Sequence, residues 1–269
     1  MTEPRTISFG ASEVAEQYSA RLSGPIFEPW AEQLVTSAAV DAGERVLDLA
    51  SGTGAVARAA ARAAGSAGGV LATDISSAML ATSAAAPVTE DSATIEFLEA
   101  PADAVPAPDQ SFDVVLCQQG LQFMPERQAV VGEARRLLRP GGRLAATVWA
   151  RGHRLIPFVD YAAALAGAGV EPPFPRAFEA GRYSLEPDDL RQLLDGFAAT
   201  QVSVVELRVS WSDAETAADA ILGTPFAPLF VALSPERQAE VRADLVRRFA
   251  PGTGTFTHSM HAVLALAAA

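Results

Sequence analysis

A glycine-rich turn follows an apolar segment near the start of the chain. Residues 46–54 read VLDLASGTG, in which three apolar residues surround Asp48, and an alanine-rich run of helical character follows. Gly52 and Gly54 have no Cβ, so the backbone can take turn dihedrals and a cofactor can lie against it. Such a loop can also cradle phosphate, but a phosphate site usually brings a cation, and the charge here is a carboxylate. The segment therefore suits a cofactor that carries positive charge, unless it is an ordinary strand-to-helix turn.

A second carboxylate lies about twenty residues beyond this turn. Residues 69–74 read GVLATD, an apolar strand that ends in Asp74. A carboxylate in that position can hold a ribose through its two hydroxyls. It can also cap the helix-like segment SSAMLATSAAA that follows, and one residue can do both. Together with Asp48 and the glycines, Asp74 indicates a cofactor that contains a nucleoside.

These segments resemble class I S-adenosylmethionine (SAM)-dependent methyltransferases, in the branch of the ubiquinone/menaquinone-biosynthesis enzymes. The stretches that carry the resemblance are VLDLASGTG, ATDIS, PAPDQSFDVVLCQQGLQFMP and LLRPGGRL. It covers about residues 15–150 and fades afterwards. The resemblance implies an α/β, doubly wound, seven-stranded and mostly parallel Rossmann-like sheet with an antiparallel last strand and a mostly helical cap. It also implies that SAM is the cofactor.

The resemblance further implies which residues bind SAM. Asp74 would hold the ribose, and Tyr18 would either lie over the cofactor or pack against the sheet. Where the family usually has an aspartate for the adenine amino group, this chain has Pro101. Adenine recognition would then use the backbone N–H of Ala102, the side chain of Asp103 or a water. The full expected set is Tyr18, Asp48, Ala50, Gly52, Gly54, Asp74, Ile75, Met79, Ala102, Asp103 and Gln118.

Three glutamines follow the fourth expected strand, in the stretch QQGLQF. They are Gln118, Gln119 and Gln122, and in the family this stretch faces the methyl group and the substrate. Neutral amides suit that place, because an arginine would repel a sulfonium and a carboxylate would stabilise its ground state. The alternative is that the amides bond to loop backbone. We expect Gln119 to position the methyl acceptor.

Three histidines are candidates for a general base. His153 follows the fifth expected strand on the active-site side and is the first choice. His258 and His261 are three residues apart in a strand and so point to opposite faces, which argues against a metal site made of the two. No other residues have the spacing of metal ligands, so no metal is expected.

The order of elements predicts a parallel, doubly wound sheet. Strands are expected at about 45–49, 69–73, 94–99, 111–118, 143–149, 201–209 and 255–266, and helices at about 11–22, 27–40, 127–138, 184–197, 212–224 and 234–249. Nearly continuous apolar strands that alternate with helices are typical of parallel sheets with both faces covered. Ligands of such sheets bind beyond the carboxyl ends of the strands, where Asp48, Asp74 and Gln118 fall.

The chain divides, on this view, into a SAM-binding core and a substrate cap. Residues 1–150 would form the core with its N-terminal helices. Residues 151–269 would add strands at about 200–210 and 254–266 and helical cap insertions at about 151–199 and 212–252. The cap residues Phe158, Tyr161, Phe226 and Phe230 favour a small, largely apolar or aromatic acceptor, such as a specialised metabolite or quinone precursor, methylated on oxygen or carbon. The chain is expected to be a monomer or homodimer.

The composition excludes several classes of function. The net charge of −12 and the isoelectric point of about 4.7 should repel polyanions, so nucleic acid is not expected as a partner. All 20 basic residues are arginine, which excludes a lysine Schiff base and a P-loop lysine. No apolar run has the roughly 18 to 20 residues of a membrane span. The first ten residues lack the apolar region of a signal peptide, and the single Cys117 fits a reducing cytoplasm.

Two other functions use the same pattern. In an NAD(P) oxidoreductase, Gly52, Gly54, Ala57 and Asp74 would form a relaxed dinucleotide fingerprint, but Asp48 would then lie close to the pyrophosphate. Alternatively, the protein would bind SAM without methylating, as a scaffold or for another reaction such as a cyclisation.

Overall fold

The computed structural model describes residues 12–172, 183–250 and 254–269. Four sequence-based expectations fall partly outside these described residues. They are the absence of a signal peptide at the N-terminus, the first residue of the helix expected at 11–22, residues 173–182 of the first cap insertion, and residues 251–252 of the second.

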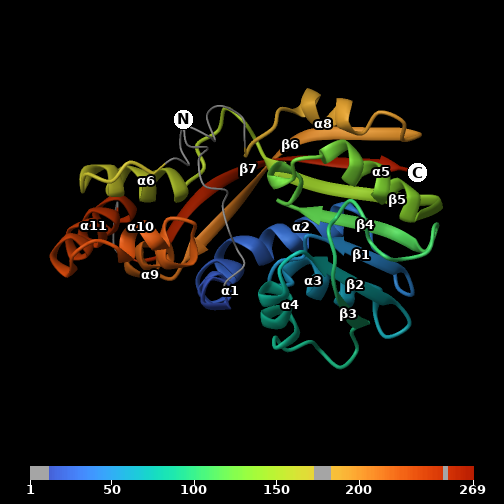
Figure 1. Ribbon diagram of the computed structural model, residues 1–269, viewed down its shortest axis with the longest axis horizontal. Helices are drawn as coiled ribbons and strands as arrows, with labels where there is room; N and C mark the ends of the chain where they lie inside the picture. The colour runs from blue at the N-terminus through green and yellow to red at the C-terminus, as the bar shows by residue number, and fades with distance from the viewer. Residues whose placement is uncertain (1–11, 173–182, 251–253) are drawn as a thin grey trace.

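A seven-stranded sheet with the order β3-β2-β1-β4-β5-β7-β6 forms the centre of the molecule (Figure 1). Its strands are β1 (Arg45–Leu49), β2 (Gly69–Asp74), β3 (Thr94–Glu99), β4 (Phe112–Gln118), β5 (Leu138–Trp149), β6 (Ala199–Trp211) and β7 (Phe256–Ala268). The first five strands pair in parallel, and β7 runs antiparallel to both of its neighbours, β5 and β6. The expected Rossmann-like sheet with an antiparallel last strand is therefore confirmed.

Helices cover both faces of the sheet. The helical segments are α1 (Ser12–Tyr18), η1 (Ser19–Phe27), α2 (Glu28–Ser37), α3 (Ala55–Ala64), α4 (Ser77–Ala84), η2 (Leu121–Phe123), α5 (Arg127–Leu137), α6 (Phe158–Gly167), α8 (Pro187–Leu193), α9 (Ala214–Asp219), η3 (Ala220–Gly223), α10 (Ala227–Val231) and α11 (Pro235–Phe249). Successive side chains of a strand point to opposite faces. Val46 of β1 thus packs in one core with α2 and α3, and Leu47 in another with α5 and α8.

The N-terminal helices differ from the expectation of two helices separated by the residues SGPI. The chain stays helical from α1 through η1 into α2, and η1 is a π-helix. The backbone N–H of Glu28 donates to the carbonyl of Ser23, five residues earlier, so the wider turn accommodates Pro25, which has no N–H of its own.

Two later boundaries also differ. The helix expected at 184–197 begins only at Pro187, because Leu185 pairs with the end of β5: its N–H donates to the carbonyl of Trp149 over 3.0 Å. Strand β5 begins at Leu138 rather than 143, and the register of β4 against it shifts between Phe112 and Val114 to accommodate the RPGG segment.

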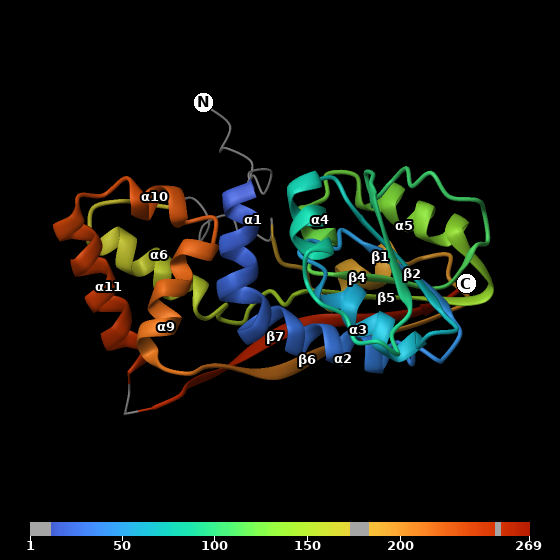
Figure 2. The same ribbon diagram turned by 90° about the horizontal axis from the view of Figure 1, so that it is seen from below.

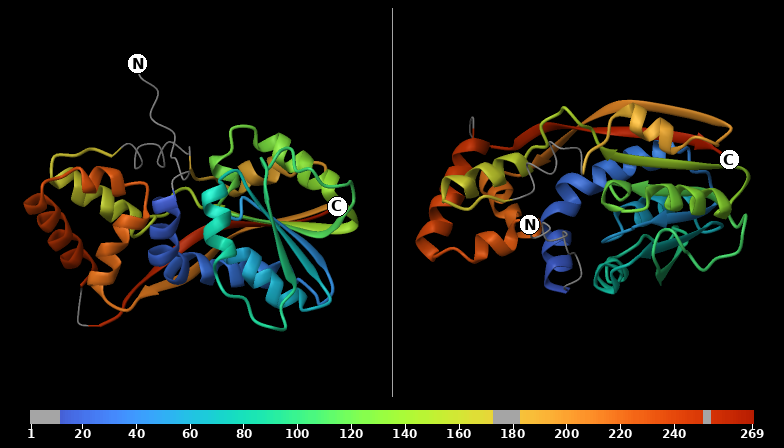
Figure 3. Two further views of the ribbon diagram at one scale, coloured as in Figure 1. Left: turned by 60° about the horizontal axis from the view of Figure 1, so that its bottom comes forward. Right: turned by 45° about the horizontal axis from the view of Figure 1, so that its top comes forward.

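Helices α6, α9, α10 and α11 gather at one end of the sheet, beside the ends of the long strands β6 and β7 (Figures 2 and 3). They share one hydrophobic core with the N-terminal helices, since Leu245 of α11 and Trp30 of α2 belong to the same cluster of buried residues. Helix α1 lies between this helical group and α4 (Figure 2). A Cβ added to Gly223 of η3 would lie 2.8 Å from the carbonyl oxygen of Gln17, so η3 packs directly on α1. None of the helices in the described ranges is long and apolar enough to cross a membrane.

Candidate cofactor and acceptor site

A cavity of about 870 Å³ lies at the carboxyl ends of the parallel strands. This volume is in the upper part of the range of about 300 to 1,000 Å³ that is usual for ligand sites, so it has room for a cofactor and a small acceptor together. Ten of the residues expected from the sequence line it: Tyr18, Ala50, Gly52, Asp74, Ile75, Met79, Ala102, Asp103, Gln118 and Gln119. Asp48, Gly54 and His153 do not.

Asp74 is held at the end of β2 by two backbone donors. Its Oδ2 accepts a 2.9 Å hydrogen bond from the N–H of Gly52, and its Oδ1 accepts one of 2.9 Å from the N–H of Ser76. Burial raises the pKa of Asp74, and these backbone N–H groups partly offset that rise. The carboxylate therefore fixes the glycine turn while it faces the cavity.

Gly52 leaves space where a side chain would lie. Its φ of +53° is in the left-handed region, and an added Cβ would meet no atom within 4 Å. Because Gly52 also lines the cavity, the open space beside it is where a ligand can approach the main chain.

Gly54 has a different role from the one expected. An added Cβ would overlap Oγ of Ser83 in α4, and the φ of Gly54 is +80°. The glycine is thus required for the turn and for the close packing of α3 on α4. The sequence pattern correctly predicted a turn glycine at this position. Its prediction that Gly54 contacts the cofactor was wrong, because Gly54 does not line the cavity.

Asp48 lies beneath the glycine turn rather than in the cavity. Its side chain is 1% exposed, and neither carboxylate oxygen has a hydrogen-bond partner among the described residues. Burial raises the pKa of Asp48 well above its usual value; the backbone N–H of Ala57, which lies outside hydrogen-bonding geometry, offsets part of the rise, and the nearby Asp74 adds to it. A buried carboxylate without a partner is costly, and a cationic ligand above the turn would lower that cost. The orphaned Asp48 and the open space at Gly52 thus fit a nucleoside cofactor with a positive charge, as SAM is.

Two non-glycine residues with positive φ lie at the ends of adjacent strands. Ala50 follows β1 with a φ of +54°, and Gln119 follows β4 with a φ of +53°; both line the cavity. Residues with side chains rarely take this conformation, and those that do cluster at functional sites. No sequence signal identified this strain.

Gln118 connects the end of β4 to the N-terminal helices. Its Nε2 donates a 3.0 Å hydrogen bond to the carbonyl of Phe27, while its Oε1 is buried without a partner among the described residues. Tyr18 stacks on Phe27, with ring centroids 4.9 Å apart, and both rings line the cavity. Burial, and to a lesser extent Asp74, raises the pKa of Tyr18 well above its usual value, so its hydroxyl stays protonated.

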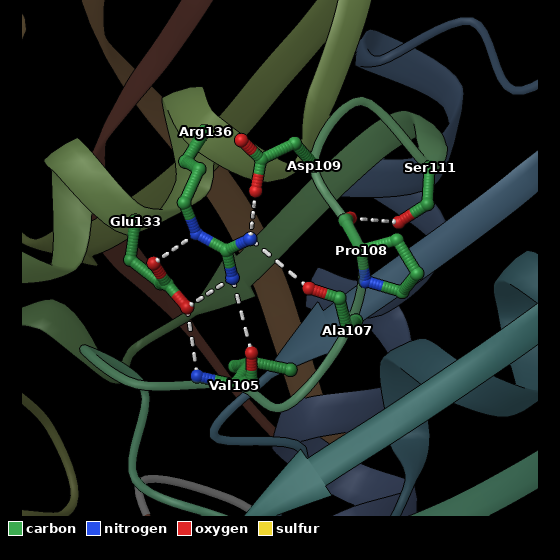
Figure 4. Close-up of polar contacts among 7 residues, drawn as sticks. All are labelled: Val105, Ala107, Pro108, Asp109, Ser111, Glu133 and Arg136. Carbon is green, nitrogen blue, oxygen red and sulfur yellow. Dashed lines mark hydrogen bonds and ion pairs between the residues drawn. The ribbon is translucent and has the colours of Figure 1, made fainter.

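The loop that carries Ala102 and Asp103 is held by hydrogen bonds with an ion-paired arginine and glutamate of α5 (Figure 4). Arg136 of α5 donates to the carbonyls of Val105 and Ala107 over 3.1 and 3.0 Å. Glu133 pairs with Arg136 over 2.8 Å and accepts the N–H of Val105 over 2.8 Å. The segment between β3 and β4 therefore has a defined conformation where it meets the cavity.

The other wall of the cavity is apolar and aromatic. It is formed by Phe123, Trp149, Leu155, Phe158 and Tyr183, and the rings of Phe123 and Tyr183 lie 5.2 Å apart. Of these residues the sequence identified only Phe158.

The other three aromatic residues expected at the acceptor pack inside the helical group. Tyr161, Phe226 and Phe230 are buried and do not line the cavity. The hydroxyl of Tyr161 donates a 2.6 Å hydrogen bond to the carbonyl of Ala217, and its ring meets Phe226 edge-on. They contribute to the packing of the helical group rather than to the lining of the cavity.

His153 is the clearest departure from the sequence-based expectation. It is exposed and lies outside the cavity, where its ring stacks on His261 of β7 with centroids 4.1 Å apart. Its pKa is lowered by partial burial and by the neighbouring imidazole. Leu155, two residues further along, is the part of this segment that faces the cavity, so His153 is not placed to act as a base. In the described ranges, no group of three or more His, Cys, Asp or Glu side chains could hold a metal ion.

Comparisons with known proteins relate this chain to methyltransferases. Residues 47–146 match a family model described as a methyltransferase domain. The chain is 34% identical over 152 residues to the ubiquinone/menaquinone biosynthesis C-methyltransferase UbiE of Chromobacterium violaceum, in an alignment that covers 55% of this chain and 62% of that protein. The chain thus spans less than two thirds of the length of this curated relative.

Two solved structures share the fold. Phosphoethanolamine N-methyltransferase 2 of Haemonchus contortus has a TM-score of 0.60 at 16% identity, over 96% of this chain and 57% of that one. The [4+2]-cyclase SpnF has a TM-score of 0.58 at 17% identity, over 99% of this chain and 97% of that one. At such low identity these two likenesses concern the fold alone. The family match and the curated relative together identify residues 47–146 as a methyltransferase domain of the class I, SAM-dependent kind, which resembles the ubiquinone/menaquinone-biosynthesis enzymes.

Proposed function

We propose that the protein transfers the methyl group of SAM to a small, uncharged, largely apolar or aromatic metabolite, at oxygen or carbon. The observation that carries the proposal is a single cavity with two unlike walls. A carboxylate and a glycine turn form one wall, and aromatic side chains form the other. Acceptors of this kind occur in specialised-metabolite biosynthesis, which is the context we propose.

The cofactor would lie along the ends of β1, β2 and β3. Asp74 would accept hydrogen bonds from the ribose hydroxyls, and the main chain at Gly52 would lie against the cofactor. Ile75 is 76% exposed at the cavity, so its side chain is free to cover a planar base. Ala102 and Asp103 would meet the edge of the adenine, and Met79, Ala50 and Tyr18 would enclose the remaining surface.

The residues of the chain would act by alignment and by excluding water. Bound SAM supplies a methyl group that its sulfonium already activates. Correct placement of two reactants can supply roughly 7 to 11 kcal/mol of the barrier, and an apolar wall of Trp149, Leu155 and Phe158 keeps water from the acceptor. No histidine or arginine is among the described lining residues. The acceptor that suits this lining is therefore one that ionises easily and needs no base from the protein.

The charge of the lining supports an acceptor without an anionic group. Asp74, Asp103 and Glu126 line the cavity, and none of the described lining residues is cationic. A carboxylated or phosphorylated acceptor would be repelled by three carboxylates and would find no guanidinium to pair with.

The test is incubation with methyl-labelled SAM and a panel of phenols, hydroquinones and aromatic carboxylates. We expect label in the product of at least one phenol or hydroquinone and in none of the aromatic carboxylates, with one S-adenosylhomocysteine formed per methyl group transferred. SAM binding without transfer to any acceptor would favour the alternative of a non-methylating, SAM-binding protein of the same fold. Failure to bind SAM, with binding of NAD(P) instead, would contradict the methyltransferase and the non-methylating SAM-binding protein alike. It would favour the hypothesis of an oxidoreductase.

A further inference from the structure

We propose that Gln122, which does not touch the cavity, is a positioning residue that turns the amide of Gln119 so that its N–H₂ group faces the methyl acceptor. This inference rests on the proposed function and adds a chemical requirement to it. The acceptor carries an uncharged oxygen that accepts a hydrogen bond from Gln119.

The two amides form a directed pair. Nε2 of Gln122 donates a 3.1 Å hydrogen bond to Oε1 of Gln119. Gln119 lines the cavity, whereas Gln122 does not. With its oxygen engaged, Gln119 has Nε2 left over, and this buried donor has no partner among the described residues. A buried N–H without a partner is costly, and a ligand oxygen in the cavity would satisfy it.

The backbone around the pair is fixed on both sides. The N–H of Gln119 donates to the carbonyl of Thr147 over 2.8 Å, although Gln119 itself has a strained positive φ. On the other side, Arg127 donates through Nε to the carbonyl of Leu121 over 3.0 Å and through Nη2 to the carbonyl of Gln122 over 2.9 Å. The backbone positions of Gln119 and Gln122 are therefore both fixed by hydrogen bonds.

Arg127 lies at the N-terminus of α5, a position where a cation does not stabilise a helix. It is the first residue of α5, where the helix dipole disfavours positive charge, and burial lowers its pKa. Its guanidinium instead holds the carbonyls of η2. Arg127 thus serves the geometry of the turn that carries Gln122.

The orientation of Gln119 is also the best account of why a glutamine occupies position 122. The side chain of Gln122 is 1% exposed, and its Oε1 has no partner in the described part of the chain. A methionine has a similar length and would remove the unsatisfied Oε1 of Gln122, but it would also take the donor away from Oε1 of Gln119. A glutamine at position 122 therefore stabilises the fold little compared with a methionine, and its one hydrogen bond orients Gln119.

The test uses the protein loaded with S-adenosylhomocysteine and three probes of similar shape. 2-Naphthol can donate and accept a hydrogen bond, 2-methoxynaphthalene can only accept one, and naphthalene can do neither. The methyl ether also has the size of a methylated product, so it fits beside the demethylated cofactor. Calorimetry would compare the wild type with Gln119→Met, Gln122→Met and, as a matched control, Gln128→Met at an exposed position of α5.

In the wild type we expect 2-naphthol and 2-methoxynaphthalene to bind at least about fivefold more tightly than naphthalene, as one hydrogen bond allows. Gln119→Met should abolish that advantage. Gln122→Met should reduce the advantage of the methyl ether more than that of the alcohol, because a free amide can present either end. Gln128→Met should change nothing, and the melting temperature of Gln122→Met should stay within a few degrees of the wild type.

Three results would overturn the proposal. One is a wild type that prefers 2-naphthol but binds the methyl ether no better than naphthalene, because the amide oxygen would then face the cavity. Another is a Gln122→Met variant that keeps the full advantage of the ether. The third is binding of none of the probes. Failure of the proposed function would be seen separately, as a lack of affinity for S-adenosylhomocysteine or of methyl transfer from SAM.

Discussion

The backbone N–H of Gly52 donates a 2.9 Å hydrogen bond to Oδ2 of Asp74, and so joins the turn after β1 to the end of β2. The two residues that the sequence singled out as separate parts of a cofactor site are thus one structural unit. The carboxylate holds the turn open where the cavity meets the main chain, and a change at either residue acts on the other.

Replacement of Asp74 by asparagine should weaken SAM binding at least about tenfold. Asparagine keeps the shape and one acceptor, but it loses the charge that strengthens hydrogen bonds to ribose hydroxyls, each of which contributes about 1.5 to 3 kcal/mol. Calorimetric titration with SAM measures the loss, and Asp91→Asn, at an exposed position before β3, is the control. Equal affinity in the two variants would contradict the ribose assignment.

The two glycines of the turn should respond differently to alanine. Both positive φ values carry a strain of about 1 kcal/mol for a residue with a side chain. Gly52→Ala adds a methyl group in open space beside the cavity, so the fold should survive and SAM affinity should fall. Gly54→Ala also overlaps Ser83, so the melting temperature should fall much further.

The pair of measurements is decisive because each variant serves as the control for the other. If Gly52→Ala melts as early as Gly54→Ala, the space at Gly52 is needed for folding. If Gly52→Ala binds SAM as the wild type does, the cofactor does not approach the main chain there.

Much of the cofactor side could be predicted because its residues follow strands directly in sequence. The carboxyl ends of parallel strands meet at one edge of a sheet, so Ala50, Asp74 and Gln118 had to lie together once the strands were identified. The pattern could not distinguish Gly52, which leaves space for a ligand, from Gly54, which leaves space for the side chain of Ser83. That distinction depends on the packing of α4 against α3.

The acceptor side could not be predicted in the same way. Phe123, Trp149, Leu155 and Tyr183 come from separate segments, and their meeting depends on how the helical group packs on the sheet in one shared core. His153 shows the same limit. Its position after β5 placed it near the site, but the packing of this segment on β7 turned its ring toward His261.

Replacement of Asp48 by asparagine should separate stability from binding. Burial raises the pKa of Asp48, so the carboxylate costs the native state free energy as the pH rises through that raised pKa. Asparagine carries no charge, and the variant should gain stability relative to the wild type at higher pH. SAM affinity should fall at least about fivefold, since a buried counter-charge is lost.

Urea unfolding at several pH values without cofactor, followed by SAM titration, checks both parts. Parallel stability curves would mean that the carboxylate has a partner that removes its cost. Unchanged SAM affinity would mean that the charge of Asp48 does not act on the cofactor.

His258 should make the fold sensitive to acid through the segment that carries two cavity residues. Its Nε2 lies 2.7 Å from the carbonyl oxygen of Ile156, between Leu155 and Phe158, and burial lowers its pKa from 6.5 to about 4. The native state therefore keeps the ring neutral where the unfolded chain, at about 6.5, takes up a proton. This contribution to stability is complete above pH 6.5, falls as the pH drops, and is lost by about pH 4. The loss amounts to at most about 3 kcal/mol, because the site is partly solvated.

His258→Gln tests this effect, because an amide can still donate to Ile156 but takes up no proton. Urea unfolding at pH 8, where the histidine is neutral in both states, gives the structural cost of the substitution alone. Between pH 7 and pH 5 the wild type should then lose more stability than the variant, and the two curves should converge or cross toward pH 4. Curves that stay parallel over this range would show that His258 titrates alike in the native and unfolded states, and its neutral hydrogen bond to the 155–158 segment would not be the source of acid sensitivity.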